Sequence, residues 1–356
     1  MIDLSTTYMG IPLRSPLVPS ASPLSRSLDQ VKRMEDAGAG AVVLHSLFEE
    51  QVGWAPDEPH PYAGSRRGDQ YMPTAAEFAL GPDEYLEHVR RAKAAVAVPV
   101  IASLNGTSGD GWLRYVRNLA EAGADALELS IHYLPTDPFL PGRAVEQVHV
   151  RLVQEAATKA AVPVAVKIDP FFTSVPAMAR ALSEAGARAL VLFNPVWAPE
   201  VDPESRSLVP GPLLSSPGDR PGAALALQWI AFLHGRVQAD LAASGGIHTA
   251  RDAAKAIVAG AAVVMMASAL LANGVDHLRA VRDELAEWME RQGCASVREL
   301  CGSLDHSSVP WPQLYERAQY VRAAGTADPW LPSHELATRA ARTTPTAAGH
   351  LAEPLG

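Results

Sequence analysis

The sequence has almost no cysteine, and this scarcity excludes two classes of protein. Only Cys294 and Cys301 occur among the 356 residues. A disulfide framework needs several cysteine pairs, and an iron–sulfur cluster needs a full set of cysteine ligands. The chain cannot build either structure by itself, and we therefore predict a cytoplasmic location.

Clusters of basic residues are also missing. Charged residues make up 19% of the chain, and the formal net charge is −9 at pH 7. A surface that binds nucleic acid or an anionic membrane needs concentrated Lys and Arg, which this sequence lacks. We therefore expect a small-molecule substrate, and neither a nucleic acid nor a membrane as a partner.

Membrane segments and metal-binding patterns are equally scarce. The uncharged run 256–272 is marginal in length and rich in Ala and Gly, so it does not predict a spanning helix. The first five residues show no basic region followed by an apolar stretch, so we expect no signal peptide. The 11 His residues form no H-E-x-x-H pattern or comparable group, so we expect no bound metal.

What the chain does contain is a recurring triplet, Ala-Gly-Ala, which follows a helical pattern and precedes a short apolar run. Glycine allows the left-handed conformation that ends a helix, and a short apolar run after it is typical of a buried strand. The triplets lie at 37–39, 122–124, 185–187 and 259–261. Together with intervening apolar runs they predict strands near 16–21, 41–46, 99–104, 125–131, 163–168, 188–193, 239–243 and 262–267.

Eight such strands, joined by helices and lacking period-two alternation, predict an α/β fold: a TIM (β/α)8 barrel in one domain, 1–325. An open doubly wound sheet with the same elements is the alternative. We expect an N-terminal hairpin over 2–14 and a C-terminal helical extension. The connection 48–80 is long enough to be a lid, and 326–356 lacks apolar periodicity, so we expect a loosely ordered tail there.

Two segments at the ends of the last strands indicate a phosphate site. Gly245 and Gly246 follow the seventh predicted strand, and Ala267 and Ser268 follow the eighth. Loops at these two places of a barrel bind phosphate through backbone N–H groups, which glycine leaves accessible. The alternative is that the glycines only permit a tight turn.

Three polar residues end other strands, at the edge where barrel active sites lie. Lys167 closes the fifth predicted strand, and a cation there is costly to bury unless it faces an anion or an electron-rich ring. An ion pair with Asp169 is the structural alternative. Asn105 and Asn194 end the third and sixth strands, where amides can bind a heterocycle or close a loop.

A set of segments identifies a resemblance to a known family. They read LSTTYMGIPLRSPLVPSASPLS, SLFEEQ, GPDEYLEHV, IASLNGT, YLPTDP, VPVAVKI, VLFNP, ASGGIHTARD and ERAQYVRA. Together they resemble the class 1 dihydroorotate dehydrogenases and their flavin-dependent relatives, over about 2–324. The resemblance implies an FMN-dependent TIM barrel that acts on the CH–CH bond of a dihydropyrimidine-like substrate. It also implies a homodimer, an electron-transfer partner and a place in pyrimidine biosynthesis.

The resemblance also implies site residues by position. Those matching FMN contacts are Ser20, Ala21, Ser22, Asn105, Ser130, Lys167, Ser215, Ser216, Gly245, Gly246, Ala267 and Ser268. Asn194 and Ser130 match residues that hold the pyrimidine, and Lys167 matches the lysine on the flavin ring edge.

Four positions depart from the family pattern, all in the substrate pocket. His45 stands in place of a lysine, Ser130 in place of an asparagine, Tyr133 in place of the catalytic cysteine or serine, and Pro135 in place of an asparagine. These departures count against dihydroorotate itself. A phenol is a poor base near pH 7 but a reasonable acid. Our hypothesis is that Tyr133, with His45 or His132, donates a proton while reduced FMN gives hydride to an activated C=C bond. The alternative is that Tyr133 only lines the pocket. If the strand continues, His132 faces away from Tyr133, and we then expect His132 to be structural.

Other functions stay open at this point. The flavin enzyme can act on a different unsaturated cyclic substrate. A non-redox barrel lyase or isomerase would use Lys167 as a Schiff base. A flavin-binding protein without turnover would serve only as a member of an electron-transfer complex.

Overall fold

The computed structural model describes residues 2–53, 81–107, 112–196, 198–209, 211, 214–216 and 220–325. The chain falls into two compact units, Met1–Val309 and Pro310–Gly356. The described part of the second unit contains η4 (Pro312–Tyr315) and α12 (Arg317–Ala324). The predicted domain boundary at 325 falls within this second unit. The predicted tail, and all of the candidate lid beyond α2 (Glu49–Gly53), lie outside the described residues.

One parallel sheet of eight strands forms the centre of the first unit. Its order is β3-β12-β11-β8-β7-β6-β5-β4, and each pair of neighbours is parallel. The strands are β3 (Leu17–Pro19), β4 (Val42–Phe48), β5 (Val100–Asn105), β6 (Ala126–Ser130), β7 (Val164–Ile168), β8 (Ala189–Leu192), β11 (Asp240–Ser244) and β12 (Val263–Met266). Gly40, just before β4, donates its N–H to Leu17 O of β3 at 2.9 Å, which brings the two sheet ends together. The predicted barrel is confirmed, and the open-sheet alternative is wrong because these edges meet.

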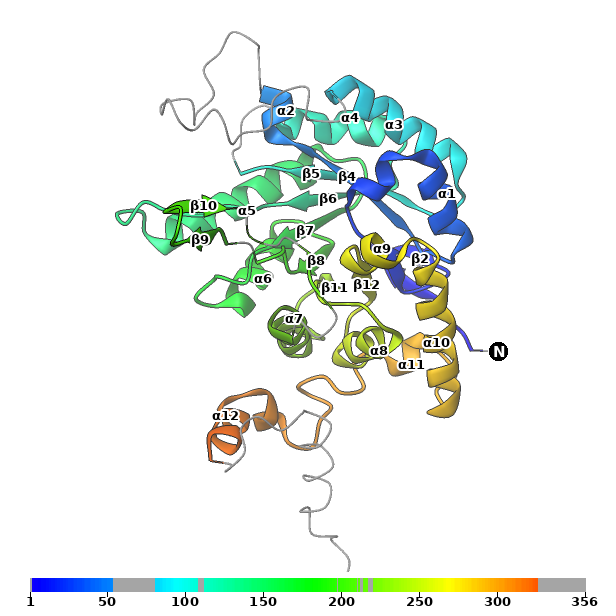
Figure 1. The fold of residues 1–356 in the computed structure, drawn as a ribbon, viewed down its shortest axis with the longest axis vertical. Helices are drawn as coiled ribbons and strands as arrows, with labels where there is room; N and C mark the ends of the chain where they lie inside the picture. The colour runs from blue at the N-terminus through cyan, green and yellow to red at the C-terminus, as the bar shows by residue number, and fades with distance from the viewer. Residues whose placement is uncertain are drawn as a thin grey trace, which may run out of the picture. The chain divides into compact units, whose positions relative to one another are not determined.

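Helices between consecutive strands surround the sheet (Figure 1). They are η1 (Pro23–Arg26), α1 (Leu28–Asp36), α3 (Pro82–Ala95), η3 (Trp112–Arg114), α4 (Tyr115–Glu121), α5 (Gly142–Lys159), α6 (Val175–Glu184), α7 (Arg220–Leu233), α8 (Ala250–Ala259) and α9 (Ser268–Asn273), followed by α10 (His277–Arg291) and α11 (Val297–Leu300). The glycine of the recurring triplet follows α1, α4, α6 and α8 with a positive φ, as predicted. Gly260, for example, has φ +120°, and a Cβ there would lie 2.5 Å from the His234 ring. Among the helices of the described ranges, none has both the length and the hydrophobicity that crossing a membrane requires.

The barrel interior is apolar toward the N-terminal ends of its strands. Alternate residues of the strands, such as Val43, Ile101 and Ala165, point into one buried cluster. The hairpin of β1 (Thr6–Tyr8) and β2 (Ile11–Leu13) closes this end, since its Met9 N–H donates to Asp240 Oδ2, at the start of β11. The predicted N-terminal hairpin is therefore confirmed. A second hairpin, β9 (Glu200–Asp202) and β10 (Ser207–Val209), follows β8.

A buried carboxylate outside the barrel contributes pH-dependent stability. Asp305 accepts hydrogen bonds from His234 at 2.6 Å and from Ser307 and Ser308. Burial acts to raise its pKa, but these hydrogen bonds outweigh burial and hold the pKa of Asp305 well below its usual range. The carboxylate therefore stabilises the fold above the pKa of an unfolded Asp, about 3.9, and this contribution is lost as the pH falls further.

We expect Asp305→Asn to lower the free energy of unfolding by about 1–3 kcal/mol at pH 7, because it weakens several hydrogen bonds to a charged, buried acceptor. The difference from wild type should shrink between pH 5 and pH 3. Urea unfolding followed by circular dichroism at several pH values measures it. The exposed Asp283→Asn is the matched control. A difference that stays constant down to pH 3 would contradict the assignment.

Candidate active site

Lys167 lies near the C-terminal end of β7 and is buried, with 7% of its surface exposed. Its Nζ donates to Glu128 Oε1 of β6 at 2.8 Å and to Ser20 Oγ at 3.3 Å. The expected alternative of an ion pair with Asp169 is wrong, because Asp169 instead accepts from His132. Sequence reasoning missed Glu128, although a charged residue inside an apolar run of a fully covered strand is a signal for a buried partner.

The polar residues at the ends of the neighbouring strands form one hydrogen-bonded row. Asn105 Nδ2 donates to Ser130 Oγ at 3.3 Å, and Ser130 Oγ donates to Asn194 Oδ1 at 2.9 Å. Asn194 Nδ2 donates to Ile131 O at 2.9 Å. Ser130 is also the register partner of Lys167 across β6 and β7. The structure therefore brings together four residues that the sequence placed in one pocket.

Ser215 joins the loops that the sequence identified as a phosphate site. Its Oγ accepts from Gly246 N at 3.3 Å and shares a hydrogen bond of 3.0 Å with His248 Nε2. Its N–H donates to Ser268 Oγ at 3.1 Å. The loops after β8, β11 and β12 thus meet at one point. Gly245 and Gly246 have φ +87° and +71°, a left-handed backbone that favours glycine.

The remaining predicted contacts lie around these loops. Ser20 donates its N–H to Met266 O at 2.9 Å, which places the end of β3 beside the start of the α9 loop. Ala21 packs on the barrel core, Ser22 is buried, and Ser216 is exposed. Ala267 is the residue before α9. A chain of contacts therefore runs from Lys167 through Ser20 to the α9 loop.

His45 is not brought into this cluster. The pairing of β4 with β5 shifts between Val43 and Ser46, so the strict alternation of β4 is interrupted there. The His45 ring packs against Tyr85 and His88 of α3, with ring centroids 5.0 and 5.4 Å away. Ser46 instead shares a hydrogen bond of 2.8 Å with Ser103 of β5. Burial, and then the nearby His88 and Arg26, lowers the pKa of His45 to about 3, so this imidazole is neutral near pH 7.

The shift in β4 is held by side chains from α3. The Tyr85 hydroxyl donates to His45 O at 2.7 Å and accepts from Ser103 N at 3.2 Å, so it replaces part of the interrupted strand pairing. His88 Nε2 donates to Ser25 O at 2.7 Å, and the Ser25 hydroxyl accepts from His45 N. These contacts fix the backbone of β4 and hold the His45 ring against α3.

Within the described residues, no hydrogen bond joins Tyr133 to the row of polar residues. Its ring lies 6.5 Å from the ring of His149 in α5, at 69°. His132, the preceding residue, forms the ion pair with Asp169. Pro135 is exposed in the loop between β6 and α5.

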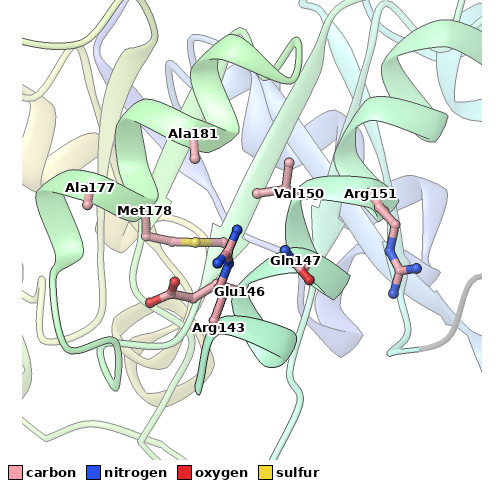
Figure 2. A pocket seen from close by; sticks show the side chains of 8 residues that line it. All are labelled: Arg143, Glu146, Gln147, Val150, Arg151, Ala177, Met178 and Ala181. Carbon is pink, nitrogen blue, oxygen red and sulfur yellow. The ribbon is translucent and has the colours of Figure 1, made fainter. Parts of the chain in front are cut away.

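A hollow on the outside of the barrel is separate from these residues. It lies between α5 and α6 and has a volume of about 460 Å³. Figure 2 shows its lining side chains, among them Arg143, Glu146 and Met178, none of which ends a strand. Within the described residues, no group of three or more His, Cys, Asp or Glu side chains is arranged to hold a metal ion.

A family model described as dihydroorotate dehydrogenase matches residues 3–289. The chain belongs to the dihydroorotate dehydrogenase family. Among its relatives, the dihydroorotate dehydrogenase B (NAD(+)) catalytic subunit of Thermoplasma acidophilum is 28% identical over 311 residues, covering 85% of this chain and 99% of the relative. The subunit of the same name from Methanosarcina acetivorans is 28% identical over 311 residues, covering 84% and 95%. That from Desulforudis audaxviator is 27% identical over 316 residues, covering 85% and 97%.

Membership of the dihydroorotate dehydrogenase family makes the chain an oxidoreductase that acts on a CH–CH bond. It counts against the non-redox lyase and against a protein without turnover. The contact of Lys167 with Glu128 adds a physical objection to the lyase, because a Schiff base requires that ammonium to lose a proton and its partner.

Proposed function

We propose that the chain is an FMN-dependent oxidoreductase acting on the CH–CH bond of a dihydropyrimidine-like cyclic substrate. The observation that carries this proposal is the position of Lys167. Its ammonium is buried at the mouth of the barrel, next to Ser20 and to the row formed by Asn105, Ser130 and Asn194. A buried cation beside polar amides suits the electron-rich edge of a flavin and the carbonyl groups of a pyrimidine.

The loops around Ser215 fit the phosphate of the same cofactor. They offer N–H and O–H donors from three segments, and glycine leaves the backbone accessible. A Cβ added to Gly245 would meet no atom within 4 Å, so there is open space beside this backbone. The residues present therefore suit a phosphate-bearing ring cofactor, with the phosphate at Gly246 and Ser268 and the ring toward Lys167.

Bound FMN would supply two-electron chemistry, accepting or giving a hydride. The chain's own residues would do the binding and orientation. Lys167 would hold the ring edge by charge, and Ser20 would fix the direction of its ammonium. Asn194 and Ser130 would position the substrate by hydrogen bonds to its carbonyl and N–H groups, at the cost of the bonds they now make to one another.

An absorption spectrum of the purified full chain tests the cofactor. We expect the visible absorption bands of an oxidised flavin, and release of FMN on denaturation. If the protein is colourless, a titration with added FMN should restore the bands. A protein that neither carries nor takes up flavin would refute the proposal.

The substrate is tested by anaerobic mixing. Dihydroorotate is the first probe because the relatives carry that name, and 5,6-dihydrouracil is the second, because Tyr133 and Pro135 replace the usual residues. We expect a cyclic dihydropyrimidine to bleach the bound flavin. Bleaching by a linear CH–CH substrate alone, or covalent fixation of a carbonyl substrate to the protein by borohydride, would point to a different pocket chemistry.

The electron acceptor and the assembly are part of the proposal. Relatives are named as catalytic subunits, and a chain with two cysteines cannot build an iron–sulfur cluster, so we propose a separate electron-transfer partner.

We also propose a homodimer. Its support is the exposed apolar side chains on loops after β6 and β7: Leu134, Phe139 and Phe171.

The dimer predicts a molar mass of twice 37.8 kDa in light scattering. We expect Phe139→Asp, at a side chain that is 91% exposed, to shift the protein toward the monomer without unfolding it. Val321→Asp, an exposed apolar residue in the second unit, is the matched control. Monomeric wild type at micromolar concentration would contradict the proposal.

A further inference from the structure

One histidine–carboxylate pair lies at the same end of the strands as the predicted site. His132 Nδ1 is 2.9 Å from Asp169 Oδ1. His132 lies two residues beyond Ser130, and Asp169 lies two residues beyond Lys167. The ladder between the two strands extends one residue past β6, since Ile131 N donates to Lys167 O of β7 at 3.1 Å. Side chains alternate along extended backbone, so we expect the pair to lie on the face of Ser130 and Lys167.

The burial of the two partners defines their roles. The Asp169 side chain is 11% exposed, whereas the His132 side chain is 41% exposed. An ionised carboxylate only accepts hydrogen bonds, so Nδ1 carries the hydrogen and Nε2 presents its lone pair. The hydrogen bond to Asp169 outweighs partial burial and raises the pKa of His132. Asp169 thus fixes the orientation of the imidazole and raises its basicity, and Nε2 is left as the acceptor.

We propose that His132 is the catalytic base of this enzyme and that Asp169 positions it. The assignment rests on the proposed flavin-dependent function. In the oxidation, His132 Nε2 takes a proton from one substrate carbon, and the two electrons of that C–H bond form the new C=C bond. A bound flavin would supply the two-electron acceptor, taking the hydrogen of the adjacent carbon as hydride, so that the flavin would be reduced as the substrate is oxidised. In the reverse direction the His132 imidazolium returns the proton.

The two other candidates are placed less well for this step. The Tyr133 ring points toward His149 in α5, and His45 packs against α3. The His45 imidazole, with its pKa of about 3, has little affinity for a proton near pH 7. His132 therefore replaces Tyr133 as the acid–base residue of our first hypothesis.

The charged groups around His132 come from three elements. Asp169 follows β7. Lys167 and Glu128 lie deeper in the barrel, and their opposite charges offset each other. The charge of Asp169 also acts on His149 of α5, but burial lowers the pKa of His149, so this ring adds no positive charge near pH 7. Asp169 is thus the main charge that acts on His132.

The first test is the rate at which substrate reduces the flavin in anaerobic stopped flow. We expect His132→Gln to lower this rate by about 100-fold or more, the usual contribution of a general base, with flavin content unchanged. His234→Gln is the matched control, because it breaks a similar His–Asp pair, with Asp305, away from the strand ends. Because His234 lies away from the strand ends, the rate of flavin reduction in this variant should stay within about twofold of the wild-type rate.

The second test needs no turnover. In wild-type protein labelled at histidine, NMR should show His132 titrating above the ordinary value of about 6.5, and Asp169→Asn should lower that pKa. In oxidation the base must be unprotonated, so the acidic limb of the rate profile should move to lower pH in Asp169→Asn.

The outcomes separate this proposal from the function on which it rests. A wild-type protein that takes up no flavin would refute the proposed function. A flavin-loaded protein that is reduced at the wild-type rate after His132→Gln would overturn only the assignment of the base. An ordinary His132 titration that Asp169→Asn does not change would overturn it too, as would a rate that depends on Tyr133→Phe but not on His132→Gln.

Discussion

Replacing Glu128 by leucine should destabilise the fold by about 3–5 kcal/mol, the usual effect of removing one partner from a buried ion pair. The Lys167 and Glu128 side chains are 8% and 1% exposed, so neither can regain water without opening the barrel. Among the described residues, the variant leaves the ammonium with Ser20 Oγ alone, a neutral acceptor at 3.3 Å. Urea unfolding at pH 7, followed by tryptophan fluorescence, measures the loss.

A double variant distinguishes this cause from poor packing. Glu128→Leu combined with Lys167→Met removes both charges and should recover most of the lost stability, because no unpaired ion remains. Glu184→Leu breaks a surface pair with Arg180, whose side chains are 74% and 67% exposed, and should change stability by less than about 1 kcal/mol. A double variant as unstable as the single one would show that packing, not charge, decides the effect.

The barrel was predictable because its signals are local. Each Ala-Gly-Ala triplet ends a helix and starts a strand within a few residues, and the eight expected strands all occur, with ends that differ by one or two residues. Gly186, with φ +109°, illustrates the reason: a left-handed residue after a helix needs glycine whatever the rest of the fold does. Elements set by neighbouring residues can therefore be inferred from one sequence.

The site was predictable only in part, because its contacts join distant segments. Asn105, Ser130 and Asn194 meet as expected, since parallel strands end at one edge. The partner of Lys167 was not found, because Glu128 is 39 positions away, and its place inside an apolar run indicates a buried partner without saying which one. The position of His45 depends on the register shift in β4, which no pattern in the neighbouring sequence predicts.

The loops show the same limit. The sequence indicated that the backbone of Gly245 and Gly246 could approach a phosphate. It did not indicate that Gly246 would form a hydrogen bond with Ser215, 31 residues away. The pairing of His132 with Asp169 spans 37 positions and was likewise not inferred. Residue type and strand position therefore predicted which side chains gather at the mouth, whereas their partners required the structure.

Lys167→Met should weaken FMN binding by about tenfold to a hundredfold, because a hydrogen bond from a charged group contributes about 1.5–3 kcal/mol. Methionine keeps most of the volume of the side chain but leaves the Glu128 carboxylate without its partner, so circular dichroism must first show that the variant is folded. Fluorescence titration of the apoprotein with FMN measures the dissociation constant. Lys159→Met, on the exposed face of α5, is the matched control and should bind as wild type does. Equal affinities in the two variants would place the flavin away from Lys167.

The same ammonium should act on the redox equilibrium, and its partner should act in the opposite direction. Two-electron reduction adds negative charge to a flavin ring, which a nearby cation stabilises and a nearby anion destabilises. Lys167→Met should therefore lower the midpoint potential of the bound flavin. Glu128→Gln keeps the shape of the side chain but removes its charge, so Lys167 is less neutralised and the potential should rise. Opposite signs from two residues in direct contact are expected only if the ring lies close to this pair; shifts of the same sign would mean that structural change, not charge, controls the potential.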